Sequence, residues 1–114
     1  MDINYQKQYS FSNLVSPSTN YRLFFDFAIF KNNRLAYLIE YDGQQHFSID
    51  HEFHKGGFQT TRQYDLLKNK YCFEHNIPLI RIPYDQEYDL NDLKLETSRF
   101  LLTKENEEEY YQRK

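Results

Sequence analysis

Two apolar runs joined by a short polar segment constrain the fold of this chain more than any other feature. Residues 21–30 and 35–42 have the length and side chains of β-strands, and the polar residues 31–34 between them predict a tight turn. The second run ends at Gly43, one of only three glycines. The sequence therefore predicts an antiparallel hairpin near the middle of one domain.

Carboxylates interrupt both arms of this hairpin. Asp26 lies in the first arm, and Glu40 and Asp42 stand two residues apart in the second, so both leave the same face of a strand. Two unpaired buried anions at ~4 Å repel by about 4 kcal/mol at an effective dielectric near 20. A bound cation would remove that cost, and carboxylate oxygens suit Mg²⁺ or Mn²⁺. Asp26, Glu40 and Asp42 are the predicted metal ligands; the alternative is that Asp26 pairs with a core Arg or Tyr.

The length of the turn decides whether these acids meet. A two-residue turn of Asn32 and Asn33 would set Asp26 opposite Ile39. A three-residue loop would instead set Asp26 opposite Glu40. Because the chemistry needs the acids together, we expect the three-residue loop.

The other elements complete a mixed α/β sheet with helical cover. Periodicity predicts a peripheral strand at 4–11, a loop at 12–20, a helix at 58–76, a short buried strand at 79–82 and a helix at 92–103. Residues 1–114 are expected to form one domain with a core at 20–84. The acidic residues from about 104 to 114 are expected to extend the last helix or to fray.

A polar stripe recurs along the predicted helix at helical spacing. Arg62, Asp65, Lys68 and Asn69 would share one face, which either looks onto the acids or is simply solvated. The loop at 43–57 is longer than usual and is expected to be mobile and to close over a ligand. It carries His46 within reach of the strand end; with His51 and His54 it could form a zinc site, although no thiolate or helix fixes them. Cys72 is expected in the core.

Bulk composition narrows the class of protein. The net charge of −3 argues only weakly against DNA, because the acids gather near the C-terminus. A single cysteine excludes an intrachain disulfide. Without an apolar stretch of ~20 residues or a signal peptide, the chain is expected to be cytoplasmic, with no membrane partner.

Four segments together carry a resemblance to a nuclease family. They are Leu-Phe-Phe-Asp-Phe (23–27), Tyr-Leu-Ile-Glu-Tyr-Asp-Gly-Gln-Gln-His-Phe (37–47), Arg-Gln-Tyr-Asp-Leu-Leu-Lys (62–68) and Pro-Leu-Ile-Arg-Ile-Pro-Tyr (78–84). In this order they resemble the homing-endonuclease branch of the PD-(D/E)xK nucleases, called EDxHD, which is similar to the very-short-patch mismatch-repair endonucleases. The resemblance covers roughly residues 20–84, and its Glu-x-Asp-Gly-x-x-His block is the most specific part.

The resemblance implies a restriction-endonuclease-like fold and a Mg²⁺-dependent endonuclease that cuts DNA. Asp42 would be the central metal ligand, with Asp26 and Glu40 completing the acidic set. His46 would act near the hydrolytic water, and Asp65 would match the family's closing aspartate. The implied catalytic set is thus Glu40, Asp42, His46 and Asp65. The basic residues expected to contact DNA phosphates are Lys55, Arg62 and Lys68.

The sequence departs from the family's pattern in two ways. The family's opening helix, with its glutamate, is expected to be absent because the chain starts too late to hold it. The usual lysine after the second acid is also missing, and His46 or Lys68 could replace it. The absent opening helix and the acidic balance of the chain favour an alternative: a catalytically inactive binding protein of phage or mobile-element type, acting on DNA or a host protein. An absent helix would also leave an apolar strip, covered by a homodimer or by the helix at 92–103; its expected residues are Tyr5, Tyr9, Phe25 and Phe27.

Overall fold

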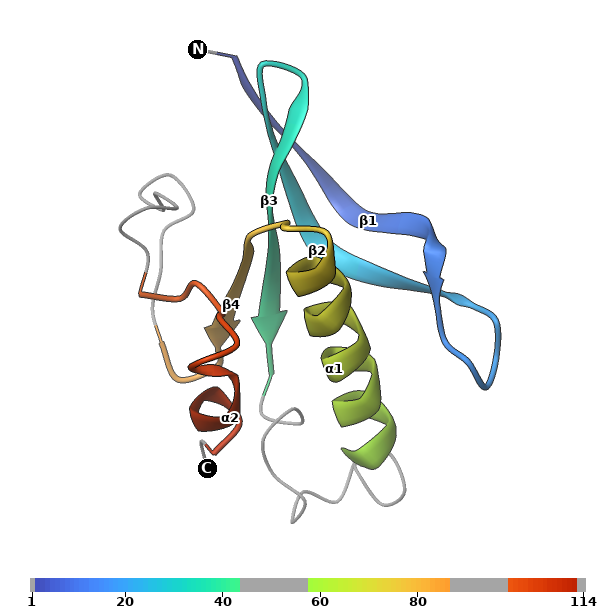
Figure 1. The fold of residues 1–114 in the computed structure, drawn as a ribbon. Coiled ribbons are helices and arrows are strands. Elements are labelled where there is room, and N and C mark those ends of the chain that lie inside the picture. The colour runs from blue at the N-terminus through green and yellow to red at the C-terminus, as the bar shows by residue number, and fades with distance from the viewer. Residues whose placement is uncertain (1, 44–57, 87–98, 113–114) are drawn as a thin grey trace.

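The computed structural model describes residues 2–43, 58–86 and 99–112 of the 114-residue chain. The elements in chain order are β1 (Ile3–Val15), β2 (Arg22–Lys31), β3 (Arg34–Asp42), α1 (Phe58–Glu74), β4 (Leu79–Pro83) and α2 (Glu107–Tyr110). They build a four-stranded sheet in the order β1-β2-β3-β4 (Figure 1). The first three strands are antiparallel and β4 runs parallel to β3. The predicted mixed α/β class is therefore confirmed.

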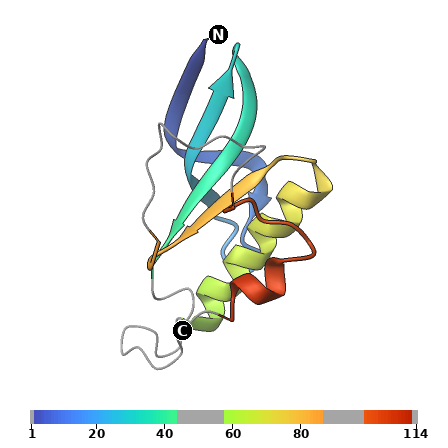
Figure 2. The ribbon, with the colours of Figure 1, turned by 90° about the vertical axis from the view of Figure 1, so that its left-hand side faces the viewer.

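Helix α1 connects β3 to β4 and covers one face of the sheet (Figures 1 and 2). Parallel neighbours need such a crossover, because a tight turn can only join antiparallel strands. The alternation of β3 points Leu38 toward this helix and Ile39 away from it. Leu38 joins a core with Phe25 and Cys72, whereas Ile39 packs in a second cluster on the opposite face. The predicted core position of Cys72 is thus confirmed.

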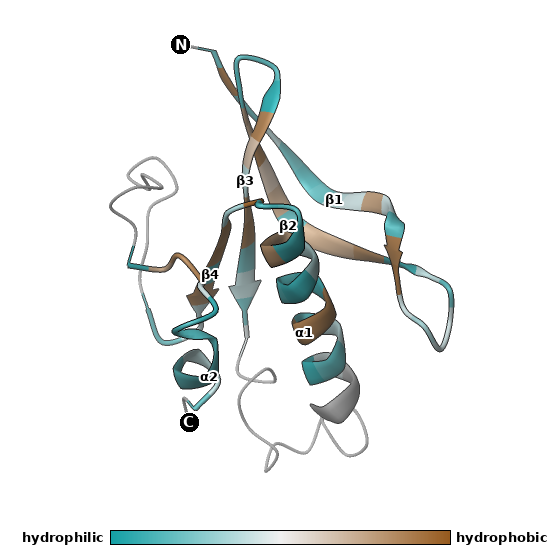
Figure 3. Cartoon of the chain, in the orientation of Figure 1, coloured by the Kyte–Doolittle hydropathy of each residue, from teal (hydrophilic) through white to brown (hydrophobic). Residues whose placement is uncertain are grey.

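The helix and the last strand match the sequence prediction closely. Helix α1 ends at Glu74, and Asn76 follows in the left-handed region at φ 55°, two residues before Pro78. All five residues of β4 are buried, and this strand stands out as hydrophobic in Figure 3.

The predicted loop at 43–57 lies outside the described residues except for Gly43, so its mobility and closure stay predictions. Among the described residues, no helix is long and apolar enough to cross a membrane.

The hairpin turn differs from the prediction, yet the acids still meet. Lys31 pairs with Arg34 around a two-residue turn, so the expected three-residue loop is wrong. Farther along, the register shifts by one residue between the pairs Phe30–Leu35 and Ile29–Tyr37, which inserts a β-bulge into β3. Beyond the bulge Phe27 faces Ile39, and one residue farther along β2 the backbone amide of Asp26 donates to Oε1 of Glu40 at 3.0 Å.

Strand β1 is longer than predicted. Residues 12–15, expected in a loop, continue the strand, since Leu14 is buried in the core and Val15 still pairs with Arg22. The expected apolar strip is also wrong as a continuous surface. Phe25 is 0% exposed, and Tyr5 contacts Phe27 on the side of the second cluster, whereas Tyr9 packs against the first. These four residues therefore do not share one exposed face, and the homodimer stays a prediction.

The C-terminal segment is not the predicted helix where the structure describes it. Residues 92–98 lie outside the description, and residues 99–103 form a turn followed by an extended segment that bridges Ile80 through Leu101. The amide of Arg81 donates to the carbonyl of Phe100 at 3.0 Å, and the amide of Leu102 donates to that of Leu79 at 2.8 Å. The outer edge of β4 is buried and must satisfy its backbone groups, so it takes this segment as a partner in extended form.

The turn supplies a first prediction. Asn32 and Asn33 have φ values of 53° and 65°, the combination of a type I′ turn, where asparagine and glycine are favoured. We expect Asn33→Ala to lower the free energy of unfolding by about 1 kcal/mol, because a Cβ without a local hydrogen-bonding group disfavours this region. Urea unfolding measures the change, and Asn33→Gly is the matched control, expected to keep or raise stability. Equal stability of the Ala and Gly variants would contradict the turn assignment.

Candidate functional site

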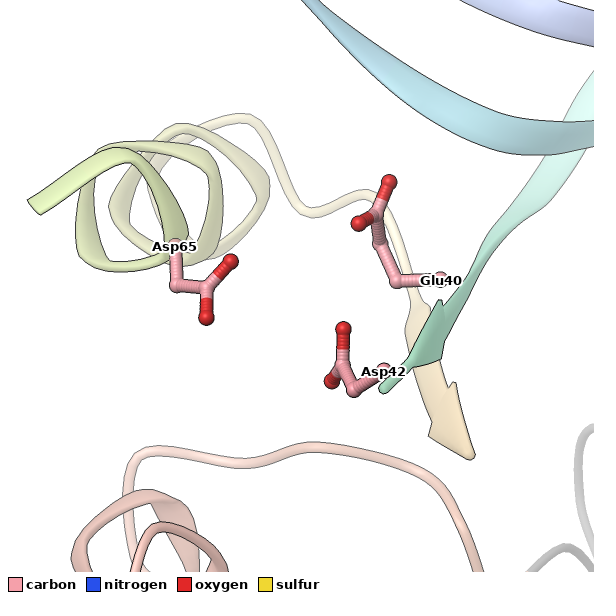
Figure 4. Close-up of side chains that lie close together, drawn as sticks. All are labelled: Glu40, Asp42 and Asp65. Atoms are coloured by element: carbon pink, nitrogen blue, oxygen red, sulfur yellow. The ribbon is translucent and has the colours of Figure 1, made fainter. Parts of the chain in front are cut away.

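Three carboxylates converge between β3 and α1. Glu40 and Asp42 leave β3 on the face that looks toward α1, and Asp65 points back from the helix (Figure 4). All three are buried, and one oxygen of each lies within 4.8 Å of the others. We call Glu40, Asp42 and Asp65 the acid cluster. Its members come from the predicted site set, and the strand period and helix position explain why they meet.

Asp26 lies beside the acid cluster, at the end of the hairpin ladder. Its backbone amide donates to Oε1 of Glu40 at 3.0 Å, and its own Oδ2 accepts from the amide of Tyr41 at 2.7 Å. At this point side-chain carboxylates, in place of backbone carbonyls, accept the amide hydrogen bonds between β2 and β3. Of the predicted metal ligands, Glu40 and Asp42 thus join Asp65, while Asp26 contacts Glu40 through the main chain.

The guanidinium of Arg81 lies among the three acids and is 0% exposed. Its Nη1 donates to both oxygens of Asp42, at 2.8 and 2.9 Å, and lies 3.9 Å from Oε2 of Glu40. Its Nη2 lies 3.5 Å from Oδ1 of Asp65, and its Nε donates to Oδ1 of Asn69 at 2.8 Å. Arg81 is placed by β4, where it pairs with Glu40 in the parallel register.

Sequence reasoning did not assign Arg81 to the site. A core arginine was considered only as a partner of Asp26, whereas the structure pairs it with Asp42. The signal was available: a lone arginine in the buried run Leu-Ile-Arg-Ile demands a partner as strongly as an acid does.

The polar stripe of α1 faces the acid cluster. Asp65 and Asn69 are buried, and Nζ of Lys68 lies 3.3 Å from Oε2 of Glu40. The guanidinium of Arg62 lies over the ring of Tyr111, 4.3 Å from its centre. The alternative prediction, that this stripe is an ordinary solvated helix face, is therefore wrong. The predicted phosphate contacts of Arg62 and Lys68 would compete with their contacts to Tyr111 and Glu40. Four other predicted residues lie outside the described part of the chain: His46, His51, His54 and Lys55.

The C-terminal residues also reach the site, which the sequence reading did not foresee. The hydroxyl of Tyr110 donates to Oδ2 of Asp42 at 2.6 Å. Nδ2 of Asn69 donates to the hydroxyl of Tyr111 at 3.0 Å and to Oε2 of Glu107 at 2.8 Å. Tyr111 is 8% exposed, so this tail does not fray here. Two adjacent tyrosines in a charged segment were the signal for packing.

The site keeps a residual negative charge. Arg81 and Lys68 offset two of the three charges of the acid cluster, and Asp26 adds another nearby. Burial chiefly raises the pKa of Glu40, with smaller contributions from Asp26 and Asp42, and Lys68 and Arg81 oppose them. Although burial lowers the pKa of Arg81, its acidic neighbours, Asp42 foremost, hold it well above its ordinary value, so this side chain stays charged.

The donor set fits a hard divalent cation in part. Carboxylate oxygens are the right ligands, and the residual charge favours a cation. However, both oxygens of Asp42 face Arg81, and one also accepts from Tyr110. A metal ion would have to share Asp42 with these donors. At Glu40 it would meet Lys68, 3.3 Å from Oε2, and at Asp65 it would meet Arg81, 3.5 Å from Oδ1.

Comparisons with known proteins give two partial relatives. The chain is 36% identical over 74 residues to uncharacterized protein 094L of Frog virus 3 (isolate Goorha), covering 62% of this chain and 46% of that protein. It is 38% identical over 48 residues to uncharacterized protein 307L of Invertebrate iridescent virus 6, covering 40% and 24%. The chain thus spans less than half the length of these relatives. No family model and no solved structure matches.

The ion pair of Arg81 and Asp42 supplies a second prediction. We expect Arg81→Met to lower the free energy of unfolding by about 3–5 kcal/mol, because it leaves buried carboxylates without their counter-charge. Asp42→Asn should also destabilise, and the double variant should lose less than the two single losses added together. Urea unfolding of all four proteins measures this coupling. Strictly additive losses would show that the two side chains do not depend on each other.

The raised pKa of Glu40 supplies a third prediction. The folded protein holds this proton more tightly than the unfolded chain, so its contribution to the free energy of unfolding falls as pH rises from the ordinary value of 4.5 through the folded pKa. We expect Glu40→Gln to gain stability relative to wild type over the pH range that begins at 4.5 and ends where the folded pKa of Glu40 is passed. Urea unfolding across this range measures the difference, with Glu74→Gln, at an exposed position, as baseline. A difference that shrinks with rising pH would contradict the prediction.

Proposed function

We propose that this chain is a metal-dependent nuclease domain that hydrolyses phosphodiester bonds in DNA. The observation that carries the proposal is the acid cluster: three carboxylates from two elements, buried within 4.8 Å of one another. Buried acids lose their hydration and repel one another, and Arg81 and Lys68 offset only two of the three charges, so a further cation would stabilise the cluster. The resemblance of the surrounding motifs to the PD-(D/E)xK nucleases supplies the reaction class.

In this proposal Glu40, Asp42 and Asp65 hold Mg²⁺ or Mn²⁺, with Asp26 at the margin. Such an ion supplies Lewis-acid polarisation of the phosphate and activates water at neutral pH. Arg81 orients Asp42 through both of its oxygens, and such outer partners of metal ligands are commonly needed for affinity. Lys68, beside Glu40, is the described cation suited to meet a phosphate oxygen. His46 is proposed to orient or deprotonate the water.

A second function, binding without catalysis, is favoured by the position of Arg81. Its guanidinium already neutralises part of the acid cluster and engages both oxygens of Asp42, as a structural counter-ion would. A protein with this arrangement could keep a nuclease-like core and bind DNA or a host protein. The two functions differ in whether a divalent cation binds at the acid cluster.

Cleavage of plasmid DNA tests the enzymatic proposal. Supercoiled plasmid should be nicked with Mg²⁺ or Mn²⁺, and both Glu40→Gln and Asp65→Asn should slow nicking by about 100-fold or more, since even outer partners of metal ligands contribute roughly 10–100-fold. These isosteric changes avoid stranding Arg81. The control Glu74→Gln removes an exposed carboxylate at the far end of α1 and should cut at the wild-type rate.

A cation-binding measurement separates the two functions. Binding to the folded state alone stabilises by about 2.7 kcal/mol at a hundredfold excess over the dissociation constant, which appears as a rise in melting temperature. The nuclease proposal expects this rise with Mn²⁺ in wild type and its loss in Glu40→Gln. If neither Mg²⁺ nor Mn²⁺ raises the melting temperature and no nicking occurs, the nuclease proposal fails and the non-catalytic function is favoured.

A further inference from the structure

The C-terminal segment contains two parts that are held in different ways. Leu101 bridges to β4 and Leu102 is buried in the core, so this part is an apolar anchor. Residues 107–112 comprise α2 and the residues that follow it; we call them the clasp. Between the parts, Thr103 and Asn106 exchange hydrogen bonds of 2.8 and 3.1 Å, which forms a turn.

The clasp depends on contacts at the functional site for its position. Helix α2 has four residues and buries none of them, and Figure 3 shows it as mainly hydrophilic. Isolated helices shorter than ~12 residues are marginal in water, so the surroundings must hold it. At the site, Tyr110 contacts Asp42, and Glu107 and Tyr111 contact Asn69. Tyr110 also packs against the first core cluster, and the ring of Tyr111 lies beneath Arg62.

These contacts converge on groups that organise the acid cluster. Asn69 accepts from Arg81, Arg81 engages both oxygens of Asp42, and Tyr110 donates to Oδ2 of Asp42 at 2.6 Å. The short distance is typical of a hydroxyl donating to a carboxylate, which is a strong kind of hydrogen bond. Burial and the neighbouring Asp42 raise the pKa of Tyr110, so its hydroxyl keeps the proton that it donates.

We propose that the clasp regulates the site by competing with a divalent cation for Asp42. In the closed state Tyr110 occupies Oδ2; when a cation takes that oxygen, Tyr110 is displaced and the clasp loosens while the Leu101–Leu102 anchor stays in place. The inference rests on the proposed metal site. Its physical basis is that Oδ2 already accepts from Nη1 of Arg81 and from the hydroxyl of Tyr110, so a cation can coordinate this oxygen only where the phenol proton leaves. A cation that binds only the open state has its apparent affinity reduced by the fraction of molecules that are open.

Calorimetric titration of the full chain with Mn²⁺ tests the competition. Tyr110→Phe keeps the ring but removes the competing hydroxyl, and we expect it to bind Mn²⁺ about tenfold or more tightly than wild type, the order carried by one hydrogen bond to a charged group. The matched control Tyr21→Phe alters a tyrosine that is 76% exposed and should bind as wild type does.

Amide hydrogen exchange of the same proteins reports the clasp directly. In Tyr110→Phe, and in wild type with Mn²⁺, the amides of residues 107–112 should exchange faster, while the amide of Leu102, which donates to Leu79, keeps its protection. Retained anchor protection also shows that the variant is folded. Unchanged exchange in the clasp of Tyr110→Phe would overturn the inference.

The outcomes separate this inference from the proposed function. If Mn²⁺ binds, Glu40→Gln removes binding, and Tyr110→Phe binds equally or more weakly, the metal site stands and the clasp does not compete. If neither wild type nor Tyr110→Phe binds Mn²⁺, the proposed metal site fails, and the competition fails with it.

Discussion

The ion pair between Arg81 and Asp42 is the interaction on which the rest of the site depends. Both side chains are fully buried, and removing either would leave an uncompensated charge in the core. The pair joins β3 to β4 beyond their backbone ladder, and through Asn69 and Asp65 it reaches α1. One guanidinium therefore fixes the relative positions of the central strands and the helix that covers them, which is also what aligns the acid cluster.

Much of this arrangement is present in the sequence as local pattern. The two-residue spacing of Glu40 and Asp42 fixes their common face whatever the tertiary structure, and the helical spacing of Asp65, Lys68 and Asn69 fixes a second face. Because buried acids need partners, the sequence predicts that Asp26 lies beside Glu40, and the structure confirms this contact. The same demand, applied to the lone charge in Leu-Ile-Arg-Ile, would have found Arg81. The wider nuclease-like fold is more specific than the mixed α/β sheet and stays a proposal.

The errors arise where long-range pairing overrides local preference. The bulge in β3 shifts the register by one residue, and no residue type in the segment 34–37 indicates it. The prediction that Asp26 and Glu40 lie together is therefore right, but the turn length on which it was based is wrong. The helical pattern at 92–103 likewise could not reveal that the buried edge of β4 needs hydrogen-bond partners. That need draws Leu101 and Leu102 into extended form, and the chain that follows brings Tyr110 and Tyr111 to the acid cluster.

The same contacts serve stability and the proposed chemistry, and this couples the two. A site whose acids were left unpaired would bind a cation strongly but would weaken the fold in its absence. Here Arg81 and Lys68 offset part of the charge, and Tyr110 gives Asp42 a hydrogen bond from a neutral donor. A neutral donor can leave without stranding a charge, whereas Arg81 cannot. The hydrogen bond from Tyr110 to Asp42 can therefore give way to a cation without leaving a buried charge unpaired, as the proposed competition requires.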